Sequence, residues 1–395
     1  MSMENTLYRK YRPRRFADMV GQDKVTRPLR NAFRENNLVH AFLFTGTKGT
    51  GKTTVAKILA KLLNCEHPTP EQEPCNKCPN CLAADAGTHP DIKEEDAASN
   101  RGIDNIRQLV NEVSYRPTQG KYRVTIIDEA HMLTTEAFNA LLKTMEEPPE
   151  GVAFILVTTE AGKIPATVAS RCQVHRFTPI AAADVVSVLI SVAKKEKIGL
   201  TERGAAALAA EAAGSLRDAL GKLQQLRDYA GGEEIDAEVV YDFLGVTSSL
   251  TLARTMDLVL EKDLVGLLSY ANEVLDGGTD PVQFVGDLQK YLHKAFRLAV
   301  SAENRKLFYS TDDEFRSLTK HADAFGQQRL IELVEIASKT LWRLGTNAVP
   351  RLTLEAALTY MAYPEYDSGD VGANAKLRDL DRRVSGLTRV IELLE

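Results

Sequence analysis

The feature that most constrains this chain is a glycine-rich loop that has every fixed position of the pattern G-x-x-x-x-G-K-[ST]. The loop consists of Gly46, Thr47, Lys48, Gly49, Thr50, Gly51, Lys52 and Thr53. It follows an apolar run at 41–44 and opens a helical pattern at 52–63, which is the strand–loop–helix context that such a loop requires. Glycines let backbone N–H groups turn towards anionic oxygens, and the helix N-terminus adds partial positive charge. We therefore predict a nucleotide phosphate site, with Lys52 at the β- and γ-phosphates and the Thr53 hydroxyl on Mg²⁺.

The spacing of apolar residues indicates the fold class. Between 41 and about 177, short apolar runs alternate with helical patterns, which is typical of a parallel sheet covered by helices. A further stretch at 91–95 contains Lys93 and Glu95, which make it a poor central strand. Strand signals end near 181, and helical periodicity continues to Tyr360. The predicted divisions are an α/β nucleotide-binding core at 1–179, a helical lid at 180–244, an all-α domain at 245–363, and a linker with an amphipathic helix at 364–395.

A pair of carboxylates, Asp128 and Glu129, follows the apolar run at 124–127. In ATPases with a phosphate loop, the first acid holds Mg²⁺ through its water shell and the next polarises the attacking water. Strands often end in Asp or Glu, so the pair alone is a weak signal. Together with the intact loop it predicts hydrolysis as well as binding.

Four of the five cysteines are clustered in the sequence. They are Cys65, Cys75, Cys78 and Cys81. Their close spacing suits tetrahedral Zn²⁺ in a structural site, within a module at about 64–90, and His67 and His89 are spare ligand candidates. An iron–sulfur cluster or unligated reduced thiols are the alternatives. Cys172 lies outside the cluster and requires a different explanation.

Composition limits the remaining possibilities. A net charge of -5 gives no global case for nucleic-acid binding, although basic residues gather at 9–15, either as a functional patch or as a solvated arm. No apolar run approaches the length of a membrane span, and residues 1–10 lack the apolar core of a signal peptide. We therefore expect a cytoplasmic protein without a disulfide framework or a membrane partner.

Taken together, several motifs resemble those of the gamma/tau subunits of bacterial DNA polymerase III, the clamp-loader ATPases of the AAA+ class. Besides the loop and the four cysteines, the motifs are Leu-Tyr-Arg-Lys-Tyr-Arg-Pro at 7–13, Val-Gly-Gln at 20–22, Asp-Glu-Ala-His at 128–131, Ser-Arg-Cys at 170–172 and Gly-Ser-Leu-Arg-Asp-Ala-Leu at 214–220. The resemblance runs from about 5 to 245. It departs from the family in Ala130, where valine is common, and in the charged stretch at 91–95.

The resemblance implies an AAA+ core with a zinc insert, a lid and an all-α collar for oligomerisation. It makes Thr159 the sensor-1 residue and Arg217 the sensor-2 residue, and it makes Arg171 the arginine finger supplied to the ATP of a neighbouring subunit. Residues expected around the nucleotide are Tyr8, Arg12, Val20, Gln22 and Thr54. An arginine that acts in a neighbouring site requires an oligomer.

The implied activity is ATP-driven opening of a sliding clamp and its loading onto primer–template DNA of any sequence, with ATP, Mg²⁺ and Zn²⁺ as cofactors. The implied partners are the delta and delta prime subunits, further copies of this chain, the clamp and DNA. Two alternatives are a superfamily-two helicase, for which we find no second motor domain, and a scaffold subunit, against which the intact Lys52 and Glu129 argue.

Overall fold

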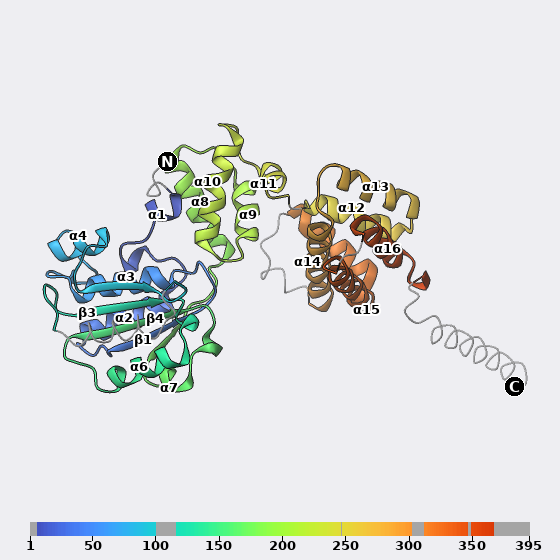
Figure 1. Cartoon of the computed structure of the whole chain (residues 1–395). Coiled ribbons are helices and arrows are strands. Elements are labelled where there is room, and N and C mark those ends of the chain that lie inside the picture. Colours follow the sequence, from blue (N-terminus) through green and yellow to red (C-terminus); the bar gives the residue numbers. More distant parts are fainter. Residues whose placement is uncertain (1–5, 100–115, 246, 302–311, 347–348, 367–395) are drawn as a thin grey trace, which may run out of the picture. The chain divides into compact units, whose positions relative to one another are not determined.

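The computed structural model describes residues 6–99, 116–245, 247–301, 312–346 and 349–366 (Figure 1). The chain divides into two compact units, residues 1–237 and 238–395. From residue 367 on, the predicted linker and amphipathic helix lie outside the described residues. Within the described ranges, no single helix is long and apolar enough to cross a membrane. One bent pair of helices, Ala237–Leu244 with Ser249–Glu261, is long and apolar enough when the two helices are taken together.

A five-stranded sheet forms the centre of the first unit, in the order β2-β3-β4-β1-β5. All four strand pairings are parallel. The strands are β1 (Ala41–Thr45), β2 (Ile92–Asp96), β3 (Arg123–Asp128), β4 (Val152–Thr158) and β5 (Gln173–Arg176). Every residue of β1 and β4 is buried, because these strands lie inside the sheet and are covered on both faces.

The charged stretch predicted as a poor central strand is β2, which lies at an edge of the sheet. The side chains of Lys93 and Glu95 are 44% and 21% exposed, and they form an ion pair of 3.2 Å. An edge strand tolerates such residues because its outer side meets solvent, and their charge discourages pairing with another chain.

Side chains alternate along β1, so that Phe42 and Phe44 face one side of the sheet and Ala41 and Leu43 face the other. The helices α2 (Asp23–Arg34) and α3 (Lys52–Leu63) pack in the first cluster, and α6 (Thr135–Glu146) and α7 (Ala166–Ala169) pack in the second. Figure 1 shows α6 and α7 on the opposite side of the sheet from α3. The predicted α/β core with helices on both faces is confirmed.

Three helices follow the sheet and form the predicted lid: α8 (Ala182–Glu196), α9 (Glu202–Glu211) and α10 (Leu216–Ala230). The hydroxyl of Ser215 caps α10 by accepting a hydrogen bond of 3.3 Å from the N–H of Asp218, and Gly231 ends the helix in the left-handed region. The N-terminal helix α1 (Leu7–Lys10) packs against α10. The remaining short elements are α4 (Pro79–Ala86) and the 3-10 turns η2 (Phe16–Asp18), η3 (Ala130–Met132) and η4 (Ala161–Lys163).

The second unit is helical throughout its described part, as predicted. Its helices are α11 (Ala237–Leu244), α12 (Ser249–Glu261), α13 (Leu264–Asp276), α14 (Pro281–Val300), α15 (Asp312–Leu344) and α16 (Pro350–Ala362), followed by η6 (Pro364–Tyr366). Gly326, with φ of 69°, breaks α15 into two helical segments. We predicted the lid to end at 244, whereas the division between the two units falls at the start of α11.

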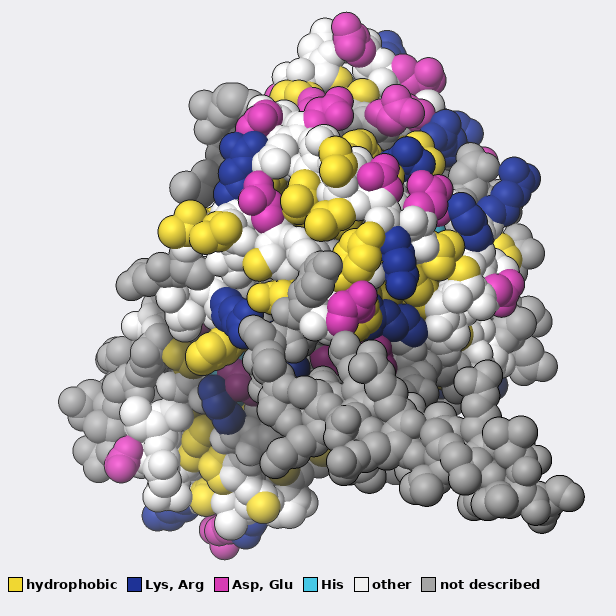
Figure 2. Space-filling view, turned by 90° about the vertical axis from the view of Figure 1, so that its right-hand side faces the viewer, with side chains coloured by type: hydrophobic (Ala, Val, Ile, Leu, Met, Phe, Trp, Pro, Cys, Tyr) yellow, Lys and Arg dark blue, Asp and Glu magenta, His cyan; other side chains and the backbone are white. Residues whose placement is uncertain are grey.

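Surface charge agrees with the modest net charge of the chain. On the face that Figure 2 shows, acidic, basic and hydrophobic side chains are interspersed wherever residues are drawn in colour. The coloured part of this face therefore offers no broad basic surface to a polyanion.

Asp91, which precedes β2, ties a turn to the sheet. Its buried carboxylate accepts hydrogen bonds from the N–H groups of Thr118, Gln119 and Gly120 at 2.7–2.8 Å and pairs with Arg123 at 3.2 Å. Burial raises the pKa of this carboxyl group, but the three N–H donors outweigh burial and hold the pKa well below its ordinary value.

We therefore expect Asp91→Asn to lower the free energy of unfolding by about 3 kcal/mol at pH 7. The pKa of Asp91 is depressed in the folded state, so its stabilising effect is present above the ordinary aspartate pKa of about 3.9 and is lost as pH falls. The difference in unfolding free energy between the variant and wild type should thus begin to narrow below about pH 4 and should vanish only as the pH approaches the much lower pKa of Asp91 in the folded state. An equal difference at pH 3 and pH 7 would contradict this assignment, and Glu150→Gln, at an exposed position, is the control.

Candidate functional site

The phosphate loop joins β1 to α3, and its side chains hold its own backbone. The ammonium group of Lys52 donates to the carbonyl oxygens of Gly46 and Thr47 at 2.8 and 2.7 Å. The hydroxyl of Thr50 also donates to the oxygen of Thr47, at 2.9 Å. Gly51 caps α3 with φ of 99°, a conformation that favours glycine. The loop is thus curled around the N-terminus of α3, where backbone N–H groups and the helix dipole favour an anion.

Two glycines of the loop are required by close approaches to other elements. A Cβ atom at Gly46 would lie 2.5 Å from the carbonyl oxygen of Phe177, just after β5. A Cβ atom at Gly49 would lie 1.8 Å from the hydroxyl oxygen of Ser215, the residue that caps α10. The loop is therefore in direct contact with the sheet on one side and with the lid on the other.

The predicted acidic pair lies beside this loop, at the carboxyl end of β3. The hydroxyl of Thr53 donates to the carboxylate of Asp128 at 2.9 Å, across a sequence separation of 75 residues. Asp128 also accepts from the N–H of Glu129 at 2.9 Å. Burial lowers the pKa of Lys52, and the carboxylates of Glu129 and Asp128 oppose this shift. The structure thus brings together the lysine, the hydroxyl and the two acids that the sequence singles out.

Glu129 has a backbone φ of 48°, which is unusual for a residue with a side chain. The hydroxyl of Thr159 donates to its carboxylate at 3.2 Å, and Nδ1 of His131 lies 3.5 Å from the same oxygen. His131 also contacts the hydroxyl of Thr158 at 3.0 Å and the carboxylate of Glu160 at 3.2 Å. The predicted sensor residue is therefore next to the predicted catalytic acid.

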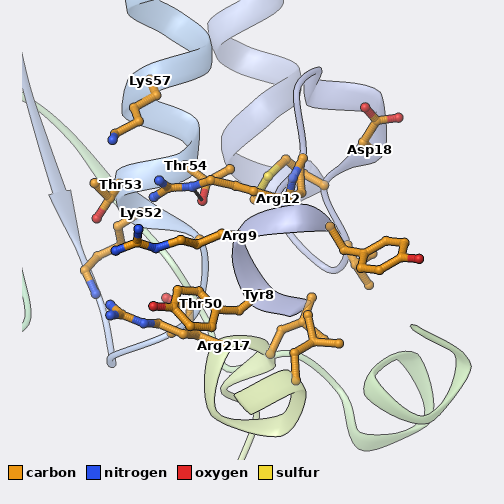
Figure 3. A pocket seen from close by; sticks show the side chains of 18 of the residues that line it. Tyr8, Arg9, Arg12, Asp18, Thr50, Lys52, Thr53, Thr54, Lys57 and Arg217 are labelled. Atoms are coloured by element: carbon orange, nitrogen blue, oxygen red, sulfur yellow. Dashed lines mark hydrogen bonds between the residues drawn. The ribbon is translucent and has the colours of Figure 1, made fainter. Parts of the chain in front are cut away.

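A pocket of about 630 Å³ opens beside the loop, between the sheet, the lid and the N-terminal segment (Figure 3). Its lining includes Gly49 to Thr54 of the loop and α3, Asp128 of β3, Leu216, Arg217 and Leu220 of α10, and Tyr8, Arg9, Arg12, Met19 and Val20 of the N-terminal segment.

Cations cluster at the N-terminal side of this pocket. The guanidinium carbon atoms of Arg217 and Arg9 lie 5.1 and 5.9 Å from the ring centroid of Tyr8. Arg12 donates to the hydroxyl of Thr54 at 3.1 Å. Tyr8 and Arg217 are thus adjacent although they come from opposite ends of the first unit, and the pocket combines an aromatic ring with positive charge.

Seven residues predicted to bind or hydrolyse the nucleotide are not among the described residues that line the pocket: Gly46, Thr47 and Lys48 of the loop, and Gln22, Glu129, Thr159 and Arg171. The amide of Gln22 is buried and donates to the carbonyl oxygen of Thr178 at 2.7 Å, which fixes the segment next to the pocket. Arg171 lies beyond α7, where it donates to the carbonyl oxygen of Thr167 at 2.6 Å and pairs with Glu146. Its side chain is 35% exposed, so it is available to a group outside this chain.

The four clustered cysteines come together in space, and their sulfur atoms lie within 4.8 Å of one another. The N–H groups of Cys75, Lys77, Cys78 and Cys81 donate to sulfur atoms of the cluster at 3.3–3.4 Å. Donors aimed at sulfur suit thiolates, and four thiolates fit a closed tetrahedral Zn²⁺ site. The cysteines therefore fit the predicted structural metal.

The protonation of these thiols differs with their surroundings. Burial raises the pKa of Cys65 and Cys81, whereas at Cys75 the N–H donors outweigh burial and lower the pKa to about 6. The described metal-binding group includes neither His67 nor His89. Nδ1 of His89 instead accepts from the N–H of Asp91 at 3.1 Å.

Cys172, which the sequence left unexplained, packs against the apolar cluster between the sheet and α6. Burial raises the pKa of its thiol to about 12, so it remains protonated at neutral pH.

Some pocket residues were not assigned from the sequence. Lys57 lies one helical turn after Thr53 and lines the pocket, so helical spacing along α3 would have indicated it. Arg9 lies in the basic segment that sequence analysis noted without giving it a role. His131 is not among the residues that line the pocket; it belongs to the acidic motif, but its contact with Thr158 of β4 depends on strand pairing.

These features define the class of the protein. A phosphate loop after β1, an acidic pair after β3, the strand order of the sheet and a helical lid beside the loop are those of a nucleotide-binding AAA+ ATPase.

Comparisons with known proteins identify the family. A family model described as DNA polymerase III, delta subunit, matches residues 21–181, and one described as DNA polymerase III subunits gamma and tau domain III matches residues 235–367. DNA polymerase III subunit tau of Bacillus subtilis (strain 168) is 36% identical over 98% of this chain and 68% of its own length. Subunit gamma/tau of Mycobacterium tuberculosis (strain ATCC 25618 / H37Rv) is 34% identical over 96% of this chain and 66% of its own length.

The chain therefore belongs to the gamma/tau subunit family of bacterial DNA polymerase III. It spans about two thirds of the length of these relatives. Among solved structures, the Bacillus subtilis DNA clamp loader delta protein aligns with a TM-score of 0.39 at 13% identity, over 85% of this chain and 98% of its own.

The cysteine cluster leads to a prediction about metal content. We expect the purified chain to hold one Zn²⁺, measured by elemental analysis, and Cys78→Ser or Cys81→Ser to lower that content at least tenfold because three thiolates leave the tetrahedral site open. Cys172→Ser is the matched control and should retain the metal. Full zinc content in Cys81→Ser, or bound iron in wild type, would contradict the assignment.

Proposed function

We propose that this chain is the ATP-hydrolysing motor subunit of the bacterial replicative clamp loader, within the DNA polymerase III holoenzyme. ATP binding in an oligomeric ring favours a shape that opens the sliding clamp and grips primer–template DNA, and hydrolysis releases both. The observation that carries this proposal is the contact of 2.9 Å between Thr53 of the loop and Asp128, with Glu129 beside it.

The binding part of the mechanism is supported by the loop. Its backbone N–H groups and Lys52 surround the β- and γ-phosphates of ATP. Tyr8 and Val20, which line the same pocket, lie near the adenine base. Thr53 and Asp128 present the oxygen donors that Mg²⁺ prefers, and the ion when bound there neutralises phosphate charge. Arg217 of the lid lines the same pocket and adds a second cation.

The hydrolytic part uses the carboxylate of Glu129 to orient a water molecule and accept its proton. That carboxylate is held by Thr159 at 3.2 Å and faces His131 at 3.5 Å. Thr159 thus connects the position of the γ-phosphate with Glu129, the general base. A change at the γ-phosphate therefore affects the carboxylate that activates the attacking water.

The rate of ATP hydrolysis depends on assembly because Arg171 acts in the ATP site of a neighbouring subunit. Its exposed side chain, anchored by Glu146 and Thr167, supports this role. An arginine supplied in trans raises the hydrolysis rate by about 10³–10⁵. Each site is therefore completed only when subunits are in contact.

The assembly comprises delta, delta prime, further copies of this chain, the clamp and DNA. ATP drives the cycle by binding one state of the assembly more tightly than the other, since a ligand shifts an equilibrium only by its differential affinity. Contacts with DNA are directed at phosphates, so that any primer junction is accepted.

Nucleotide binding is the first test. We expect Lys52→Ala to weaken ATP binding at least tenfold, measured by calorimetry, because it removes the cation at the phosphates. Lys24→Ala, on the exposed side of α2, is the control and should bind as wild type does. Unchanged affinity in Lys52→Ala would show that the loop does not hold the phosphates.

Hydrolysis is the second test, with and without clamp, delta, delta prime and primed DNA. We expect turnover to rise strongly in the full mixture. Glu129→Gln should lower it by at least about 10² while leaving ATP affinity near wild type, because the base is lost but the phosphate contacts remain. If turnover does not change when the partners and DNA are added, the chain is not the motor of a clamp loader.

The trans role of Arg171 is tested by complementation. Arg171→Ala should lower turnover by about 10³, whereas Arg203→Ala, at an exposed arginine that also pairs with a carboxylate, should not. Mixing Lys52→Ala chains with Arg171→Ala chains should restore part of the turnover. In the mixture the Lys52→Ala chain supplies the arginine and the Arg171→Ala chain binds the ATP. No recovery on mixing would mean that Arg171 does not act across subunits.

A further inference from the structure

The N-terminal arm, defined as residues 6–22, lines the nucleotide pocket but has little structure of its own. Its regular elements are the four-residue helix α1 and the three-residue turn η2. Tyr8 and Arg12 from its first half and Met19 and Val20 from its second half line the pocket. The shape of the pocket therefore depends on contacts that hold this arm from outside.

The first half of the arm is held by the lid. The N–H of Leu7 donates to the side-chain oxygen of Gln224 at 2.8 Å. The hydroxyl of Tyr11 and the ammonium group of Lys10 both contact the carboxylate of Glu196, each at 2.6 Å. The contacts of Leu7 and Tyr11 are part-buried, whereas Lys10 is 55% exposed and its ion pair stabilises only modestly.

The second half is held at its end by Gln22, whose amide donates to Thr178, and at its start by one buried carboxylate from the cysteine module. Glu73 accepts hydrogen bonds from the consecutive N–H groups of Phe16 and Ala17, at 2.7 and 3.0 Å. Glu73 is only 4% exposed, and a guanidinium nitrogen of Arg30 lies 3.5 Å from its carboxylate. Each carboxylate oxygen thus binds one N–H of the arm. Removal of the carboxylate leaves both donors without this partner, and the Phe16 donor lies in a buried site.

The position of Glu73 is set by the metal-binding loop. Glu73 and Thr69 exchange two hydrogen bonds, from the N–H of Thr69 to the Glu73 carbonyl oxygen at 2.9 Å and from the N–H of Glu73 to the Thr69 hydroxyl at 3.3 Å. The loop that contains this turn begins at Cys65 and ends at Cys75, whose N–H donates to the Cys65 sulfur at 3.3 Å. Ligation of both cysteines to one metal closes the loop and removes its conformational freedom.

We propose that Glu73 is a positioning residue through which the four-cysteine module holds the N-terminal arm against the nucleotide pocket, so that metal occupancy and nucleotide affinity depend on each other. The inference rests on the proposed ATP site. By linkage, the factor by which metal tightens nucleotide binding equals the factor by which nucleotide tightens metal binding.

The test compares ATP affinity of the full chain before and after removal of zinc by a chelator, which is then dialysed away. For wild type we expect affinity to fall about tenfold on stripping, or about 1.4 kcal/mol. Zinc-loaded Glu73→Ala should bind as weakly as stripped wild type, and stripping it should cause no further loss. Glu71→Ala, an exposed glutamate in the same turn, is the matched control and should behave as wild type.

The reverse measurement does not depend on stripped protein. Competition with a chromophoric chelator gives the zinc affinity with and without ATP. ATP should tighten zinc binding by the same factor in wild type and should not change it in Glu73→Ala. Glu73→Gln, which keeps the size of the side chain and one acceptor oxygen, should give an intermediate factor and serves if the alanine variant does not fold, as judged by circular dichroism.

The outcomes separate this inference from the proposed function. If zinc-loaded wild type binds no ATP, the proposed ATP site is wrong. If wild type binds ATP equally well with and without zinc, the ATP site stands and the coupling is wrong. If stripping weakens ATP binding equally in wild type and Glu73→Ala, the coupling does not pass through Glu73.

Discussion

The parallel pairing of β1 with β4, and of β4 with β3, is the interaction on which the site depends. In this register Thr45 lies opposite Thr158 and Ile127 lies opposite Leu156. The carboxyl ends of the three strands therefore meet at one edge, and the loop after β1 begins beside the acids after β3. A slip of one residue would exchange side chains between the two buried clusters, for example Phe42 and Phe44 with Ala41 and Leu43 of β1, so packing on both faces fixes the register.

Much of the fold follows from local patterns. The apolar run at 41–44 and the helical spacing at 52–63 correspond to β1 and α3, because both elements are buried on defined faces and carry strong periodicity. β2 was the least certain strand, since its charged residues are tolerated only at a sheet edge, and the strand order is not readable from one sequence. The position of the division between the units likewise depends on packing that no local pattern records.

Site residues could be predicted from the sequence where they belong to a recognisable motif. Lys52, Thr53, Asp128 and Glu129 meet as expected because the loop and the strand end each have a chemical signature. Glu73 has none: it is one acidic residue among many, and its partners are backbone N–H groups far away in the sequence. Backbone donors have no sequence signature at all, so such a contact appears only once the chain is folded.

The contact between Gly49 and the cap of α10 has a mechanical consequence. With no side chain between them, the phosphate loop and the lid touch backbone to hydroxyl, and α10 also carries Arg217 into the pocket. Rotation of α10 therefore displaces the loop and the arginine together, with no intervening layer to absorb the movement. The N-terminal cap of α10 therefore joins the lid to the phosphate loop through Ser215, two positions before Arg217 on the same helix.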